Sequence, residues 1–319
     1  VNQPDQDREA HVDDFPGPGA ILNHLGKGSN SVPCSVSLPN WLSIPGPSNR
    51  MPGQYGGFLG SVFDPLVIEG NPNQKGYRPL QLGLQRGMTH SRLSQRLELM
   101  QQLDKTARRL ERQLHRRYDE LQQTAYDLVV DGRVRRALDL SMEPPQNRDR
   151  YGRNKCGQSL LLARRLVEAG VKFVSYNAFN QEWDTHGNLE RRYKQFVPPI
   201  DQGFAALIGD LAERGLLEST LVINAGEFGR TPTINKQAGR DHWPNVYSIA
   251  VAGGGIQSGQ TIGRSDGKGS EVAEHPISPA DLLATMWHQL GIAPDLEIRD
   301  QLNRPFMLSS GHVIRDLLA

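Results

Sequence analysis

Five side chains with metal-ligating chemistry lie in three short segments of the second half of the chain. They are Asp184, His186, Glu227, Asp241 and His242. A mixture of carboxylate and imidazole ligands suits Zn²⁺, Mn²⁺ or Fe²⁺ better than Ca²⁺ or Mg²⁺, which prefer oxygen ligands. We therefore expect one or two divalent transition-metal ions here, Zn²⁺ or Mn²⁺. Such an ion polarises an ester oxygen and lowers the pKa of a bound water or hydroxyl.

Two arginines flank these residues. Arg230 and Arg240 can hold a phosphate or sulfate oxygen through their guanidinium groups, and we assign them this catalytic role. An alternative is that either arginine forms a structural salt bridge with Asp241 or Glu227. Equally, Asp184 can cap a turn and His186 can be an ordinary loop histidine. Other histidines, His275 and His288, are expected to pack or lie in loops.

The elements that must position these residues follow an alternating pattern. The apolar runs 171–176 and 220–224 each follow a helical segment, the first starting near 156 and the second spanning about 200–214. A third apolar run spans 246–252. Apolar strands that alternate with helices predict an α/β fold with a mostly parallel sheet. Ligands bind beyond the carboxyl ends of such strands, so the segments after 176 and 224 should open on one edge.

This reading makes two geometric predictions. The strands 171–176 and 220–225 should be parallel neighbours or near neighbours in one sheet. The side chains of Asp184, His186, Glu227 and His242 should then converge on a common point.

The remaining segments predict further helices. The Gly- and Pro-rich first ninety residues contain a short helix near 17–25 and a strand near 32–38. Apolar residues at steps of three and four predict a helical insertion over 91–140. The charged face of this insertion is either solvated or an assembly surface. A last helix begins at Pro279 and continues to about 290, where Gly291 ends it.

Composition excludes several classes of protein. The chain has 319 residues, and 36 Lys and Arg against 35 Asp and Glu give a net charge of +1, so no global field favours nucleic acid. No apolar run approaches the ~20 residues of a membrane span. Two cysteines, Cys34 and Cys156, are too few for a disulfide scaffold. The Gly-x-Ser-x-Gly elbow of serine hydrolases is missing, and the three glycines at 253–255 fit no nucleotide-binding loop.

Several motifs resemble a known family. The segments that carry the resemblance are 226–232, 234–235, 238–244 and 253–256, with further similarity at 58–65, 151–165 and 183–186. They are similar to an exported bacterial, sulfatase-like family of unknown function in the alkaline-phosphatase-like superfamily. The resemblance implies an α/β/α sandwich, periplasmic localisation and metallohydrolase chemistry. It also implies Glu227 as a carboxylate ligand after a central strand, with Asp184, His186 and His242 as further ligands.

The beginning of the chain departs from that family. Relatives start with a twin-arginine export signal and a first strand that bears the nucleophile, whereas this chain begins at Val1 in a polar segment. We therefore expect one domain over 1–319 that lacks its first strand. Such a fragment should bind metal weakly and be inactive until the upstream segment is restored.

The resulting hypothesis is a metal-dependent hydrolase of phosphate or sulfate esters that acts on a small molecule or a glycan. The alternative is a non-catalytic exported accessory protein of the same fold that holds an anionic glycan. A third possibility makes the insertion over 91–140 the working part. The sequence does not specify the oligomeric state.

Overall fold

The computed structural model describes residues 9–28, 32–43, 51–79, 91–92, 94–96, 98–99, 132–178 and 183–319. The chain forms two compact units, the first comprising 1–43, 47–149 and 153–178 and the second 44–46, 150–152 and 179–319. Most of the helical insertion predicted over 91–140 lies outside the described residues. The single domain predicted over 1–319 stays a prediction. Among the described residues, no helix has the length and apolar character needed to cross a bilayer.

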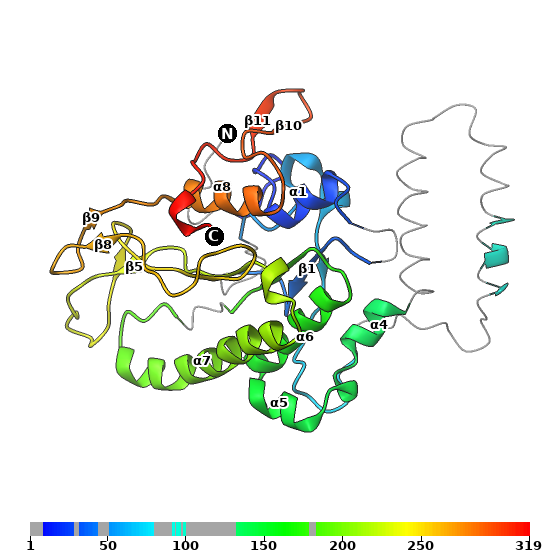
Figure 1. The fold of residues 1–319 in the computed structure, drawn as a ribbon, viewed down its shortest axis with the longest axis horizontal. Coiled ribbons are helices and arrows are strands. Elements are labelled where there is room, and N and C mark those ends of the chain that lie inside the picture. The colour runs from blue at the N-terminus through cyan, green and yellow to red at the C-terminus, as the bar shows by residue number, and fades with distance from the viewer. Residues whose placement is uncertain are drawn as a thin grey trace. The chain divides into compact units, whose positions relative to one another are not determined.

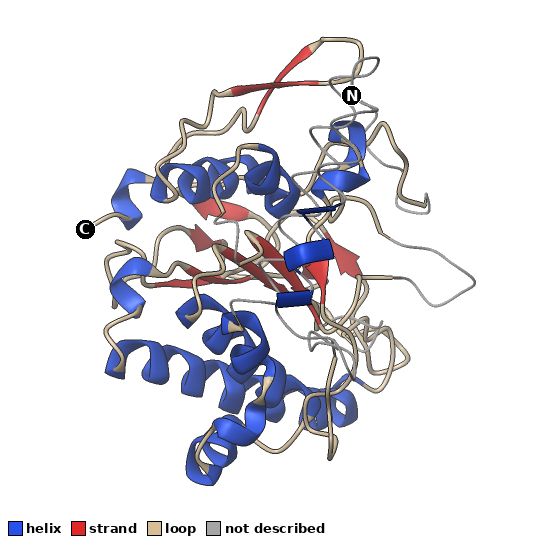
Figure 2. Cartoon of the chain, turned by 90° about the vertical axis from the view of Figure 1, so that its right-hand side faces the viewer, coloured by secondary structure: helices blue, strands red, loops and turns tan. Residues whose placement is uncertain are grey.

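The first unit is built around a parallel three-stranded sheet. Its strands are β1 (Ser35–Leu38), β2 (Leu66–Val67) and β3 (Phe173–Tyr176), in the order β2-β1-β3. The central strand β1 is buried along its whole length. Helices α1 (Pro18–His24) and α6 (Lys155–Glu168) lie on opposite sides of β1 (Figures 1 and 2). This arrangement confirms the α/β class, while the finer α/β/α sandwich stays a prediction.

Local sequence signals explain the two helices on this sheet. In α1, a Cβ on Gly19 would press against Ser35 and Phe173, so glycine lets the helix approach the sheet closely. In α6, the Asn154 side chain accepts a hydrogen bond from the Gly157 N–H at 2.9 Å and caps the first turn. The predictions of a helix near 17–25 and one from about 156 are confirmed. The other helical elements of this part of the chain are α4 (Arg133–Leu138), α5 (Pro145–Tyr151), η1 (Gly57–Leu59), η2 (Ser61–Phe63) and η3 (Leu140–Met142).

The second unit begins with the long helix α7 (Leu189–Glu213). It starts well before the predicted residue 200 and continues through Pro198 and Pro199, which sequence rules place at helix breaks. Aromatic contacts help to fix its first half, because the ring of Trp183 lies 6.2 Å from that of Tyr193 and 6.1 Å from that of Phe196. Tertiary packing therefore overrides the local proline signal.

Among the described residues of the second unit, all of the strand pairs are antiparallel. The pairs are β4 (Val222–Asn224) with β7 (Ala250–Ala252), β5 (Gly229–Arg230) with β6 (His242–Trp243), β8 (Arg264–Ser265) with β9 (Val272–Glu274), and β10 (Glu297–Arg299) with β11 (Pro305–Met307). The prediction that the strands near 171–176 and 220–225 are parallel neighbours or near neighbours in one sheet is wrong, because β3 pairs with β1 in one sheet and β4 pairs with β7 in another. The chain returns from β4 to β7 without the crossover helix that a parallel pair requires.

The last helix, α8 (Pro279–Gln289), agrees with its sequence signals at both ends. Ser278 and Asp281 form a capping box, and Gly291 has a φ of 70° just past the end. The Trp287 side chain is buried. Short 3-10 helices η4 (Leu217–Ser219) and η5 (Arg315–Leu317) complete the elements described.

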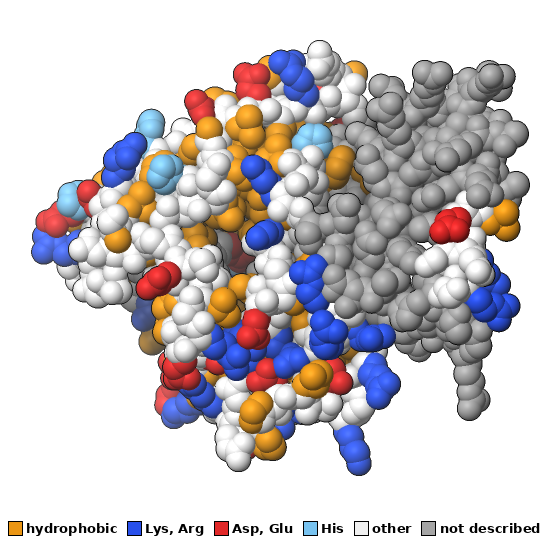
Figure 3. Space-filling model, turned by 45° about the vertical axis from the view of Figure 1, so that its right-hand side comes forward, with side chains coloured by type: hydrophobic (Ala, Val, Ile, Leu, Met, Phe, Trp, Pro, Cys, Tyr) orange, Lys and Arg blue, Asp and Glu red, His pale blue; other side chains and the backbone are white. Residues whose placement is uncertain are grey.

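Charged side chains of both signs lie close together on the surface. Lys and Arg are interspersed with Asp and Glu on the face shown in Figure 3. Exposed ion pairs are found among the described residues, such as Arg150 with Glu213 at 2.7 Å. This mixing agrees with the net charge of +1.

Candidate metal site

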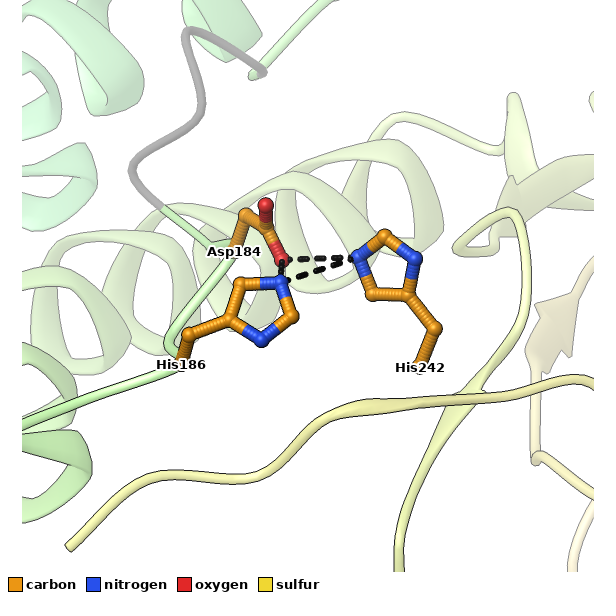
Figure 4. A group of neighbouring side chains, drawn as sticks. All are labelled: Asp184, His186 and His242. Carbon is orange, nitrogen blue, oxygen red and sulfur yellow. Dashed lines mark hydrogen bonds and ion pairs between the residues drawn. The ribbon is translucent and has the colours of Figure 1, made fainter. Parts of the chain in front are cut away.

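Three of the predicted ligands converge in the second unit. The Oδ1 atom of Asp184 lies 3.1 Å from Nε2 of His186 and 3.1 Å from Nε2 of His242, and the two Nε2 atoms are 3.2 Å apart. Figure 4 shows the three side chains pointing toward one another, with Asp184 and His186 on one segment and His242 on another. We call these residues the Asp/His/His cluster; among the described residues, it is the set that could hold a metal ion.

The spacing of these three atoms matches one face of a tetrahedral metal site. Zn²⁺ binds imidazole nitrogen and carboxylate oxygen at about 2.0–2.2 Å, which places neighbouring ligands of a tetrahedron roughly 3.3–3.6 Å apart. The observed separations of 3.1–3.2 Å lie just below that range. Since the side chains are 27% exposed at Asp184, 49% at His186 and 45% at His242, a fourth position can open to solvent.

Asp241 supports the cluster from behind. Its Oδ1 lies 2.8 Å from Nδ1 of His186, so the proton of a neutral imidazole belongs on Nδ1. The Nε2 atom of His186 then turns its lone pair toward the acceptor oxygen of Asp184. Two acceptors this close repel one another unless a cation or an added proton lies beside them, and in this structure the Arg230 guanidinium is such a cation. The hydrogen bond from His186 lowers the pKa of the Asp241 carboxyl, and a second hydrogen bond from Asn235 lowers it further.

Asn235 ties the two loops of the cluster together. Its amide nitrogen donates to the His186 carbonyl at 3.0 Å and to Asp241 Oδ1 at 3.1 Å. Its amide oxygen accepts hydrogen bonds from the backbone N–H groups of Gln237 and Gly239, both at 3.0 Å. One side chain therefore fixes its own turn, the backbone of one ligand and the carboxylate that orients that ligand.

Backbone contacts complete the joint between these loops. A Cβ on Gly239 would overlap the carbonyl group of His186, so only glycine allows this approach. Three backbone hydrogen bonds also join the loops, from the N–H groups of Asn188, Leu189 and Arg240 to the carbonyls of Gln237, Ala238 and Thr185 respectively. The cluster is thus held by a cross-linked loop pair rather than by the edge of a parallel sheet.

The strand pair β5–β6 places Arg230 directly opposite His242. The Nη1 of Arg230 donates to Asp184 Oδ1 at 2.5 Å, and its guanidinium carbon lies 5.7 Å from the ring centre of Phe228. The Phe228 ring also packs on His242, with ring centres 4.6 Å apart. Partial burial raises the pKa of Asp184, but hydrogen bonds from Arg230 and His242 outweigh it and leave the pKa below its usual value.

The other predicted residues occupy different positions. Glu227 is exposed and lies outside the Asp/His/His cluster, so its role as a ligand stays a prediction. Asp241 contacts the far nitrogen of His186 instead of joining the cluster. Arg240 directs Nη1 to the carbonyls of Thr231 at 2.5 Å and Pro232 at 2.8 Å, so it braces its own loop. Arg230 forms its salt bridge with Asp184, not with Asp241 or Glu227 as the sequence suggested.

Sequence reasoning assigned no role to two residues of the site. Asn235 carried only the general tendency of asparagine to bond its own backbone in turns, which does not indicate the bonds to His186 and Asp241. Phe228 lies within the segment 226–232 that carries the resemblance, but nothing in that segment indicates that its ring packs on His242. Their roles depend on the pairing of β5 with β6 and on the loop crossing at Gly239.

The fold and the site define an α/β protein with a partly exposed Asp/His/His cluster braced by a carboxylate and an arginine. The sequence model of the family described as "Protein of unknown function (DUF1501)" matches residues 8–318, and the chain belongs to this family. No curated protein and no solved structure matches the chain.

This family membership corrects the resemblance drawn from the motifs. The matching family is described only as one of unknown function, and no sulfatase-like family matches the chain, so neither a hydrolase activity nor a place in the alkaline-phosphatase-like superfamily is shown. The predicted truncation is not supported, because the match covers residues 8–318 and gives no evidence that a segment is missing. Any function must therefore be argued from the cluster.

Proposed function

We propose that the Asp/His/His cluster binds one divalent first-row transition-metal ion, Zn²⁺ or Mn²⁺. The observation that carries this proposal is the triangle of Asp184 Oδ1, His186 Nε2 and His242 Nε2, with all three sides between 3.1 and 3.2 Å. One carboxylate oxygen and two imidazole nitrogens suit such an ion. The Asp241 carboxylate on His186 Nδ1 supplies the outer partner that metal-bound histidines usually have.

We further propose that this site hydrolyses an anionic ester, a phosphate or a sulfate carried by a small molecule or a glycan. The charges of Asp184 and Asp241 are matched by those of Arg230 and Arg240, so a divalent ion makes the site positive and favours an anion. When bound, the ion polarises an ester oxygen and lowers the pKa of a water or hydroxyl beside it.

The two arginines divide the supporting roles. Because Arg240 already donates to two backbone carbonyls, its main task is to hold the loop that carries Asp241 and His242. Arg230 is the guanidinium directly beside the cluster, with a side chain only 17% exposed, and it is the group that meets the anionic oxygens. A partly buried guanidinium binds an anion more strongly than a fully exposed one because less solvent screens the charge.

Metal content and ester turnover test the proposal together. The protein is stripped of metal, titrated with Zn²⁺ or Mn²⁺ by calorimetry, and assayed on p-nitrophenyl phosphate and p-nitrophenyl sulfate. We expect one ion per chain and metal-dependent turnover. Loss of a group that only orients a ligand typically weakens metal binding by about 10–100-fold. His242→Ala removes a ligand itself, so its effect on the metal affinity should be larger. The control is His288→Ala, an exposed histidine in α8 outside the cluster.

The outcomes separate the candidate functions. Loss of both metal and turnover in His242→Ala, with His288→Ala unchanged, supports the hydrolase. Stoichiometric metal and anion binding without turnover of either ester supports the alternative of a non-catalytic protein that holds an anionic glycan. A wild-type protein that binds neither ion, or a His242→Ala variant with wild-type affinity, contradicts the metal site.

A further inference from the structure

Arg230 binds the carboxylate oxygen that a bound metal ion would also need. Its Nη1 donates at 2.5 Å to Asp184 Oδ1, the same oxygen that faces Nε2 of His186 and of His242. That oxygen is therefore the meeting point of one guanidinium and two imidazoles. A carboxylate has about four lone-pair sites over its two oxygens, about two on each, so few strong partners fit on one oxygen.

A metal ion and the Arg230 guanidinium would compete for this oxygen on electrostatic grounds. A divalent ion and a guanidinium both gain by contact with the Asp184 carboxylate, and they repel each other when they share one oxygen. Without metal, Arg230 neutralises Asp184. With metal, the same carboxylate has a stronger partner, and the guanidinium is left in need of an anion.

Arg230 stays beside the cluster when it gives up Asp184. The β5–β6 register fixes its backbone opposite His242, and the ring of Phe228 lies 5.7 Å from the guanidinium carbon. A largely buried guanidinium without a carboxylate partner is costly, which favours the capture of an oxyanion from solution.

We propose that Arg230 exchanges between Asp184 and a bound oxyanion, and that this exchange makes metal binding and oxyanion binding mutually reinforcing. The inference rests on the proposed metal site and adds a regulatory property to it: the site acquires affinity for its anionic ligand as it is loaded with metal. Linkage requires the effect to be reciprocal, so the oxyanion must tighten the metal by the same factor as the metal tightens the oxyanion.

Substitution of Arg230 separates its two effects. Arg230→Gln removes the rival of the metal ion, so the affinity for metal alone should rise, by about 10-fold within the 5–150-fold range usual for such couplings. The same variant has no guanidinium to pass to an oxyanion, so the reinforcement should vanish. Arg230→Met, which retains an apolar stem against Phe228, should behave likewise and controls for changes in folding. The matched control is Arg264→Gln, an exposed arginine paired with Glu274.

The test is a Co²⁺ titration followed by calorimetry and by the visible absorption of the bound ion. Each protein is titrated in sodium sulfate and in sodium chloride of equal ionic strength, so that screening is the same in both. For the wild type and Arg264→Gln we expect sulfate to lower the Co²⁺ dissociation constant about 10-fold. For Arg230→Gln and Arg230→Met we expect tighter Co²⁺ binding in chloride and no effect of sulfate.

The possible failures are distinguishable. If the wild type binds no Co²⁺, the proposed metal site is wrong and the coupling falls with it. If the wild type binds Co²⁺ but sulfate has no effect, or if both Arg230 variants keep the wild-type sulfate effect, the metal site stands and the coupling is overturned. Weaker Co²⁺ binding by both Arg230 variants in chloride would also overturn it.

Discussion

The Asp241 carboxylate lies 2.8 Å from Nδ1 of His186, while Nε2 of the same ring faces Asp184. The two acidic residues thus act on opposite nitrogens of one imidazole. Asp241 orients the ring and fixes its proton, and Asp184 lies beside the nitrogen that would bind the proposed metal ion. This division preorganises a group of loop residues.

Asp241→Ala should weaken the metal affinity by about 10–100-fold, because it removes the group that orients His186 and fixes its tautomer. Its side chain is 54% exposed, so the stability of the metal-free protein should change little. Calorimetric titration with Zn²⁺ measures the first effect and urea unfolding the second. Asp201→Ala, in an exposed part of α7, is the control. Wild-type affinity in Asp241→Ala would show that His186 needs no such partner.

Asn235 should act through both ends of its amide. Asn235→Ala loses the bonds to His186 and Asp241 and those from Gln237 and Gly239. Asn235→Asp keeps an acceptor for the two backbone N–H groups but cannot donate, so the turn should persist. We expect both variants to lose roughly 10-fold in metal affinity. Asn235→Asp also places a carboxylate oxygen against Asp241 Oδ1 and the His186 carbonyl, so both variants should lower the melting temperature of the metal-free protein. Wild-type melting of either variant would contradict these roles of the Asn235 amide.

Gly239→Ala should damage the site without touching a ligand side chain. The added methyl group would overlap the His186 carbonyl, so the loop must shift and carry the Asp/His/His cluster out of register. Both metal affinity and melting temperature should fall. Gly267→Ala is a matched control, since a Cβ there meets nothing within 4 Å. If the two substitutions have the same effect, the close approach at Gly239 does not position the cluster.

Asp281 should make α8 sensitive to acid. Hydrogen bonds from the His312 N–H and from Ser278 lower the pKa of the Asp281 carboxyl in the folded protein. Its unfolded value is about 3.9. A lowered folded value stabilises the protein above that pH and loses this contribution as the pH falls through the folded pKa.

Urea unfolding of the metal-free protein at pH 6 and pH 3 measures this contribution. Asp281→Asn should reduce the free energy of unfolding at pH 6, and the difference from the wild type should shrink at pH 3. Asp295→Asn, at an exposed carboxyl, should give no such pH-dependent difference. A difference at Asp281 that is the same at both pH values would exclude the carboxylate as its source.

Elements with signals at both ends could be predicted from sequence. Pro279 and Gly291 mark the two ends of α8 by their backbone preferences alone, and the structure agrees. Helix α7 begins earlier than predicted because contacts with Trp183, distant from the prolines in sequence, fix its first half. Strand pairing is equally non-local, so the apolar character of β3 and β4 could not reveal that they belong to different sheets.

The candidate site shows the same limit. Residue type selected Asp184, His186 and His242 because carboxylate and imidazole are metal-ligating groups, but it selected Glu227 and Asp241 equally and could not separate the two sets. Arg230 was expected near the cluster, but its pairing with Asp184 depends on the register of β5 with β6. Strands of two residues are too short for a sequence pattern to predict that register. The role of Asn235 depends on a crossing of two loops, which no local pattern encodes.

X-ray absorption spectroscopy of the Zn²⁺-loaded protein tests the central claim most directly. If Asp184, His186 and His242 hold the ion, the first shell must contain nitrogen and oxygen at about 2.0–2.2 Å. The outer-shell pattern must then correspond to two imidazole rings, falling to one in His242→Ala under conditions that keep the ion bound. A first shell without imidazole, or a spectrum that does not change in His242→Ala, would contradict the account.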